Sequence, residues 1–203
     1  MSSSDQFSVG YRYKNFVVSR NRPIPELQCS LVELLHEPSQ AQIIHIQNDD
    51  PENLFCLSFQ TIPSSSNGAA HVLEHMVLCG SKKYPVRDPF FTMSRRSLHT
   101  FMNALTGSDF TCYPAATQIE KDFYNLLHVY LDAAFHPLLN DLNFLQEAHR
   151  FELKSDQDQP LTINGVVYNE MRGAMANPLR RLMRELYQHL FPNSPYGLLG
   201  KRC

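Results

Sequence analysis

The sequence predicts an α+β fold rather than a doubly wound parallel sheet. Strand-like runs lie before and after the first helical stretches instead of alternating with them one by one. Several of these runs are joined by short turns, as in hairpins, whereas parallel strands need long crossovers. No shift in composition marks a boundary, so residues 1–203 are expected to form one domain.

Composition supports a soluble globular protein. The chain has 203 residues, of which 43% are hydrophobic and 19% charged, and its net charge is −2. This charge argues against nucleic-acid binding and against a broad contact with an anionic membrane. No apolar run reaches the roughly 18 residues of a membrane span. Neither nucleic acid nor membrane is therefore an expected partner.

Four strands are expected in the first part of the chain. Phe16–Ser19 and Leu27–Leu35 are rich in Val, Leu and Cys, and isoleucines recur along Ala41–Gln47. In Leu54–Thr61 the large side chains fall at every second position, which is typical of a half-buried strand.

The next element, Gly68–Gly80, is expected to be a short helix. Ser66, Asn67 and Gly68 form a helix-start signal, and Gly80 stands where a helix commonly ends. His71, Glu74 and His75 follow the order H-x-x-E-H along it. Residues three and four positions apart share one helix face, so these side chains cluster.

This pattern is the inverted form of a zinc-peptidase motif. Neutral imidazoles bind zinc readily, and a catalytic zinc needs three protein ligands and one open position. A carboxylate between two histidine ligands can accept the proton of a water molecule. The pattern therefore predicts a metal site on His71 and His75, with Glu74 as the base.

A helix and a hairpin are expected after the motif. Asp88 and Pro89 are typical of the N-cap and first position of a helix that runs to Ser97. Leu98–Leu105 and Phe110–Tyr113 are then joined by a turn at Thr106–Asp109, which indicates a hairpin.

The last part of the chain is expected to be helical. Thr117–Glu120 has the form of a capping box and opens a helix that ends near Phe135. A second helix is expected at Asp141–Leu153, with Glu147 and Glu152 as surface charges. After a polar loop at Lys154–Pro160, further helices are expected at Gly165–Asn177 and Leu179–Leu190.

Three phrases, LEHMVLCGS, KYPVRDPFF and TFMNALTGSDFTCYP, resemble the insulinase-type zinc metallopeptidases and most closely their presequence-protease branch. The resemblance extends from about Phe16 to about Gly197. It implies an antiparallel sheet with helices packed on one side. It also implies Zn²⁺ as the cofactor.

The resemblance also implies roles for individual residues. His71 and His75 would bind zinc, Glu74 would be the general base, and a glutamate on a later helix would be the third ligand. Glu152 has the spacing of the insulinase branch, whereas Glu170 lies in GVVYNEMRG, which resembles the presequence-protease segment that carries the ligand. We favour Glu170.

Substrates of this family bind as an added strand at an exposed sheet edge. The matching strand is Phe101–Leu105, in which Asn103, Ala104 and Leu105 are expected nearest the zinc. Main-chain pairing would carry most of the affinity, which explains cleavage of unrelated peptides.

The expected function is that of a zinc endopeptidase acting on short, unstructured, targeting-peptide-like substrates. Family members are much longer, with four related units in two halves, so residues 1–203 correspond to the N-terminal catalytic unit, truncated after about residue 197. The missing C-terminal half is an expected partner. The alternatives are a non-catalytic scaffold of the same fold, an inactive fragment that needs the missing half, and a small-molecule lyase with a cysteine as third ligand.

The expected location is the cytoplasm. The segment MSSSDQFSVGYRYKN has no apolar core of a secretory signal, and Asp5 argues against a transit peptide. The odd number of cysteines, five, is simplest to explain by reduced, buried thiols. The alternative is the mitochondrial or plastid matrix, if a transit peptide is missing.

Overall fold

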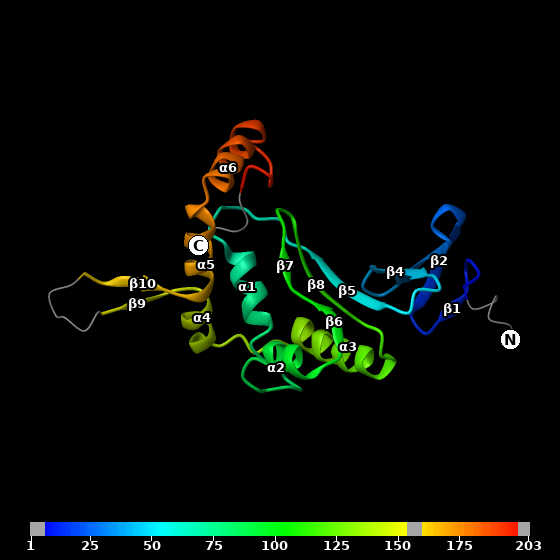
Figure 1. The fold of residues 1–203 in the computed structure, drawn as a ribbon. Helices are drawn as coiled ribbons and strands as arrows, with labels where there is room; N and C mark the ends of the chain where they lie inside the picture. Colours follow the sequence, from blue (N-terminus) through cyan, green and yellow to red (C-terminus); the bar gives the residue numbers. More distant parts are fainter. Residues whose placement is uncertain (1–6, 154–159, 199–203) are drawn as a thin grey trace. The chain divides into compact units, whose positions relative to one another are not determined.

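The structure, a computed structural model, describes residues 7–153 and 160–198 (Figure 1). Its contacts divide the chain into two compact units, Met1–Pro51 and Glu52–Cys203. No shift in composition marks this boundary in the sequence, because Asn48–Pro51 has the composition of an ordinary turn. That residues 1–203 act as a single catalytic unit stays a prediction.

The first unit is an antiparallel sheet with strand order β1-β2-β3-β4. Val18 and Val32 are its most buried side chains. The third strand begins later than predicted because residues 25–27 form a 3₁₀ turn and Gln28 adopts a left-handed conformation with φ 50°. The strands are β1 (Arg12–Tyr13), β2 (Phe16–Ile24), β3 (Cys29–His36) and β4 (Ala41–Gln47).

The second unit contains the sheet on which the functional residues depend. Its order is β5-β8-β6, and β7 pairs with β8 as well. All these pairings are antiparallel, which confirms the predicted sheet and hairpin. The strands are β5 (Asn53–Gln60), β6 (His99–Met102), β7 (Leu105–Thr106) and β8 (Phe110–Thr117).

One predicted strand, Leu98–Leu105, is interrupted. The Asn103 amide still donates to the carbonyl oxygen of Pro114 at 3.1 Å. The next amide, that of Ala104, donates instead to the Asn103 side-chain oxygen at 2.9 Å. Because this local bond replaces a ladder bond, β6 ends at Met102 and β7 starts at Leu105.

Three helices, α1 (Ala69–Val77), α2 (Pro89–Arg96) and α3 (Glu120–Phe135), contribute side chains to the core on one face of this sheet. Phe55 and Ala115 are opposite each other in neighbouring strands and face α3. The Phe55 ring meets the rings of Phe123 and Tyr130 edge-on, at centroid distances of 5.6 and 5.3 Å. This arrangement confirms helices on one side of an antiparallel sheet.

Both predicted helices are present, and Asp88 and Pro89 take the predicted N-cap and first positions of α2, but neither helix has a side-chain cap bond. Asp88 precedes α2 with φ 52° and makes no side-chain cap. The capping box at Thr117–Glu120 does not form, because α3 starts only at Glu120. The Thr117 hydroxyl instead donates to the carbonyl oxygen of Leu98 and accepts from the Ile119 amide.

The chain after α3 differs most from the prediction. The helix expected at Asp141–Leu153 ends at Glu147, and the remainder pairs as a two-stranded ribbon (Figure 1). Most of the predicted loop Lys154–Pro160 lies outside the described residues. The two later helices are confirmed. The elements are α4 (Asp141–Glu147), β9 (Arg150–Glu152), β10 (Thr162–Asn164), α5 (Val166–Ala176) and α6 (Pro178–Leu190).

None of the described helices has the length and apolar character needed to cross a membrane.

We predict that Leu126→Ala lowers the free energy of unfolding by about 2–5 kcal/mol, because it removes a fully buried side chain and leaves a cavity. Denaturant unfolding followed by circular dichroism measures this change. Leu182→Ala, at an exposed position of α6, is the matched control and should change stability little. Equal losses in both variants would contradict the assignment of the core to the α3 face.

Candidate metal centre

The short helix α1 presents the H-x-x-E-H residues toward the rest of the second unit. The Asn67 side chain accepts a hydrogen bond from the Ala69 amide at 3.1 Å, which starts the helix as the sequence indicated. Gly80, just beyond the helix, has φ 131°, and a Cβ there would lie 3.0 Å from the Val86 carbonyl oxygen. Glycine is therefore required for the chain to turn away at this point.

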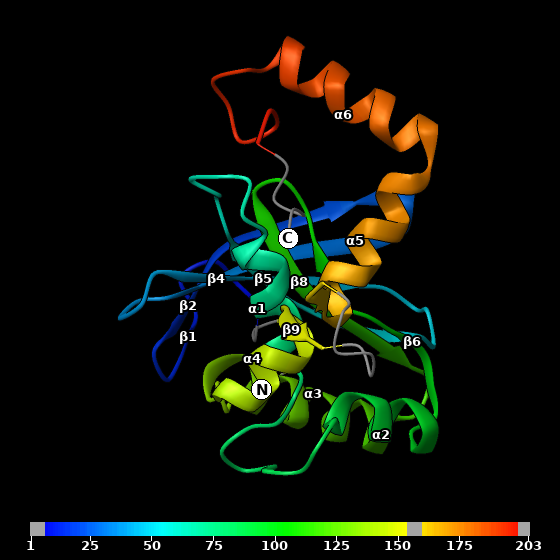
Figure 2. The same ribbon diagram turned by 90° about the vertical axis from the view of Figure 1, so that its left-hand side faces the viewer.

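The two histidines of α1 converge on a carboxylate from α5. Oε2 of Glu170 lies 3.5 Å from Nε2 of His71 and 3.6 Å from Nε2 of His75. Their rings are 5.1 Å apart at a steep angle. His71 is only 2% exposed. Figure 2 shows α5 beside α1, and the two helices are in contact.

Glu74 lies on the same helix face and is buried. One carboxylate oxygen of Glu74 and one ring nitrogen each of His71 and His75 lie within 4.8 Å of one another. The Thr106 hydroxyl on β7 donates a hydrogen bond to Oε2 of Glu74. Glu74 is thus close to the histidines but held by a different partner.

Glu152, the competing candidate for the third ligand, is bound elsewhere. It lies on β9, where Arg150 and Asn164 donate hydrogen bonds to its carboxylate at 2.7 and 2.9 Å. These bonds and the charge of Arg150 hold its pKa below the usual value. The ligand role of Glu170 stays a prediction, and the geometry supports it over Glu152.

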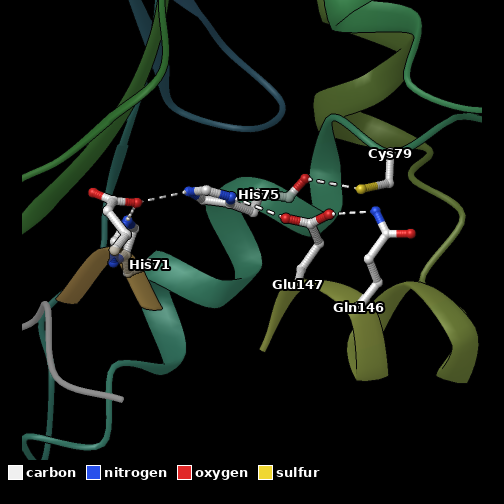
Figure 3. Close-up of polar contacts among 6 residues, drawn as sticks. His71, His75, Cys79, Gln146 and Glu147 are labelled. Carbon is white, nitrogen blue, oxygen red and sulfur yellow. Dashed lines mark hydrogen bonds and ion pairs between the residues drawn. The ribbon is translucent and has the colours of Figure 1, made fainter. Parts of the chain in front are cut away.

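Glu147 and Thr106 are neighbours of this centre that no sequence pattern indicated. Glu147 was interpreted as a surface charge, but it is buried at the end of α4, where Nδ1 of His75 donates to its Oε2 at 3.1 Å (Figure 3). Its other oxygen accepts from Gln146 at 2.9 Å, and Arg87 donates to Gln146 at 3.1 Å. Local sequence carried no signal for this contact because the partners are 72 residues apart.

The carboxylates around His75 favour its charged form. Burial lowers the pKa of His75, but the bond to Glu147 and the charges of Glu74, Glu147 and Glu170 outweigh burial and raise it. The same bond lowers the pKa of Glu147. A metal ion would therefore compete with a proton at Nε2, while Glu147 holds Nδ1 as a donor.

Cys79 lies beside this pair, and its thiol is engaged with the backbone. Its thiol donates to the carbonyl oxygen of His75 at 3.4 Å. Burial, together with the charges of Glu147 and Asp88, raises its pKa to about 12. Without a metal ion, Cys79 is thus a neutral thiol.

A cavity of about 340 Å³ opens beside the three converging side chains. Asn103, Ala104 and Leu105 line it, together with apolar side chains that include Phe90 and Phe91. The amides of Asn103 and Ala104 already donate within the unit, to Pro114 and to the Asn103 side chain. An added peptide strand would have to pair with other groups of this edge.

The donor set fits a zinc ion. Ligands about 2.0–2.2 Å from a tetrahedral zinc lie roughly 3.3–3.6 Å from one another. The Glu170 oxygen is separated from the two histidine nitrogens by 3.5 and 3.6 Å. Two imidazoles and one carboxylate are also the ligand types of a catalytic rather than a structural zinc site.

An α+β unit with an H-x-x-E-H helix and a glutamate from a second helix has the features of an inverted zinc-peptidase centre. The sequence profile of the insulinase family (peptidase family M16) matches residues 63–185. The chain belongs to this family, as the sequence analysis predicted.

Curated relatives are presequence proteases. The relative from Mus musculus, named "Presequence protease, mitochondrial", is 48% identical over 197 residues, or 96% of this chain. The relative of the same name from Schizosaccharomyces pombe is 48% identical over 191 residues, or 93% of this chain. The chain spans only about a fifth (19%) of each of these relatives. A crystal structure of pitrilysin superposes on 96% of this chain and on 19% of the pitrilysin chain, with a TM-score of 0.68. The sequence identity is 17%, so this match shows a shared fold.

We predict that Glu147→Ala lowers zinc affinity about 10–100-fold, because His75 loses the acceptor that orients its ring. Competition with a chromophoric chelator measures the affinity. The control is Glu152→Ala, which removes another hydrogen-bonded carboxylate, on β9, and should leave zinc affinity unchanged. A folded Glu147→Ala chain with unchanged affinity would contradict this role.

Proposed function

We propose that this chain carries the catalytic centre of a zinc-dependent endopeptidase that cleaves short, unstructured peptides. The observation that carries the proposal is the approach of the Glu170 carboxylate to Nε2 of both His71 and His75. Membership of a peptidase family supports the same reaction class.

In this proposal His71, His75 and Glu170 hold the zinc ion. When bound, zinc supplies Lewis acidity, which makes a water molecule more acidic and a peptide carbonyl more electrophilic. Glu74 accepts a proton from the water and returns it to the leaving amine. Because Thr106 occupies Oε2 of Glu74, Oε1 is the oxygen assigned to proton transfer.

The substrate is proposed to bind as an extended strand at the edge formed by β6 and β7. Asn103, Ala104 and Leu105 line the cavity beside the histidines, which supports their role as the nearest substrate contacts. A strand-addition site selects for a free, extended backbone rather than for one side chain. Targeting-peptide-like substrates agree with the names of the presequence-protease relatives.

We base the proposed location and the proposed partner on the names and lengths of the relatives. Their names favour the mitochondrial alternative over the expected cytoplasmic location. Because they are about five times as long, a C-terminal half that completes the substrate chamber is the proposed partner. The alternatives of a scaffold or a fragment inactive without that half are outcomes of the assay below, and family membership argues against the lyase.

We predict that Glu74→Gln abolishes cleavage of an internally quenched, unstructured peptide, with at least about a hundredfold loss of kcat, because the base is removed. Bound zinc, measured by atomic absorption, should remain near one per chain because the ligands are intact. Loss of zinc in the folded variant would contradict the assignment of Glu74 as base. If the wild-type zinc-bearing chain has no turnover, the chain alone is not an active endopeptidase.

The third ligand is tested by a separate pair of variants. Glu170→Gln should lower zinc affinity by more than about a hundredfold, since loss of a ligand exceeds the usual effect of an outer partner. Glu152→Gln should bind zinc like the wild type. The opposite result, with zinc lost only from Glu152→Gln, would transfer the ligand role to Glu152.

A further inference from the structure

Three threonine hydroxyls form a line that ends at Glu74. None of these threonines is a proposed zinc ligand. Thr106 donates to Oε2 of Glu74. Its oxygen lies 3.4 Å from Oγ1 of Thr111, which lies 2.8 Å from Oγ1 of Thr61. Thr106 and Thr111 are buried and directly opposite each other in β7 and β8. Three separate chain segments therefore combine to reach one carboxylate oxygen.

The direction of every bond in this line follows from the number of protons. A hydroxyl has one proton to donate, and an ionised carboxylate can only accept. Thr106 uses its proton on Glu74, so Thr111 must be the donor in the contact between the two threonines. When Thr111 makes this donation, Thr61 is the donor in the 2.8 Å bond between Thr61 and Thr111. In this arrangement all three hydroxyls point toward Glu74.

We propose that Thr106 is a positioning residue for Glu74, and that Thr111 and Thr61 keep the Thr106 hydroxyl in its donating orientation. This inference rests on the proposed function of Glu74 as the base. The bond holds one carboxylate oxygen against the sheet and thereby directs the other oxygen toward the cavity. Small displacements of a catalytic group are costly, since about 1 Å can change a rate a hundredfold.

A purely structural role for these threonines makes a different prediction. Threonine and valine have nearly the same shape, so valine would fill the same space in β7 or β8. A buried hydroxyl is costly unless it is hydrogen-bonded, and the hydroxyl of Thr106 makes its charge-assisted bond to Glu74. If the hydroxyl served only packing, valine would leave catalysis unchanged.

The effects should decrease along the line. The bond from Thr106 to Glu74 ends on a charge and is the strongest. The 3.4 Å contact between Thr106 and Thr111 is long for two hydroxyls. We therefore expect Thr106→Val to lower kcat about 10–100-fold, in the range of a displaced catalytic group. Thr111→Val should have a smaller effect.

The test compares Thr106→Val with Thr106→Ser in the full zinc-loaded chain. Valine should lower kcat with little change in KM or zinc affinity, and serine should restore most of the rate because it restores the hydroxyl. The matched control is Thr117→Val, at a buried threonine of β8 that donates to the carbonyl oxygen of Leu98. Its kcat should equal that of the wild type.

A double-mutant cycle with Glu74→Gln completes the test. Because Glu74→Gln is expected to have no cleavage to compare, the cycle is measured by the free energy of unfolding, in which the two changes should be non-additive. Three results would overturn the positioning role of Thr106 but not the proposed function: wild-type kcat in Thr106→Val, no rescue by serine, or additive changes in the free energy of unfolding. A wild-type chain that binds zinc without turnover would overturn the proposed function and the positioning role with it, even if the stabilities show that the bond exists.

Discussion

Burial of His71 and Glu74 in the second unit is the constraint on which the rest of the centre depends. A buried polar or charged group is costly unless it is hydrogen-bonded or paired. Each member of the H-x-x-E-H motif accordingly meets a partner from another element: Glu170 of α5 approaches both histidines, Glu147 of α4 holds His75, and Thr106 of β7 holds Glu74. The packing of these elements on α1 is thus also what assembles the chemistry.

His75 and Glu74 differ in the kind of partner that holds each side chain. His75 and Glu147 form a pair whose charges favour a proton on the ring until a metal ion competes for Nε2. Glu74 is held instead by a neutral hydroxyl, which can fix an oxygen without adding a charge. A ligand needs an acceptor that orients it, whereas a base needs one oxygen held and the other open. The two environments on one short helix agree with these two needs.

This chain is much shorter than its relatives but includes all of the proposed zinc ligands and the proposed base. The chain spans about a fifth of its presequence-protease relatives, yet it includes both histidines, the intervening glutamate and Glu170. The proposed ligands and base can therefore come from one compact unit, Glu52–Cys203.

The sequence by itself determined the features that depend on local spacing. The i, i+3 and i+4 positions of His71, Glu74 and His75, the hairpin around residues 106–109 and most strands follow from periodicity and turn residues. Family resemblance pointed to Glu170. Only the tertiary structure brought Glu147 and Thr106 to their partners, which are 72 and 32 residues away in the sequence. It also decided that the helix at Asp141 ends at Glu147, because the next residues pair with β10. Such choices depend on long-range partners, which local sequence patterns do not specify.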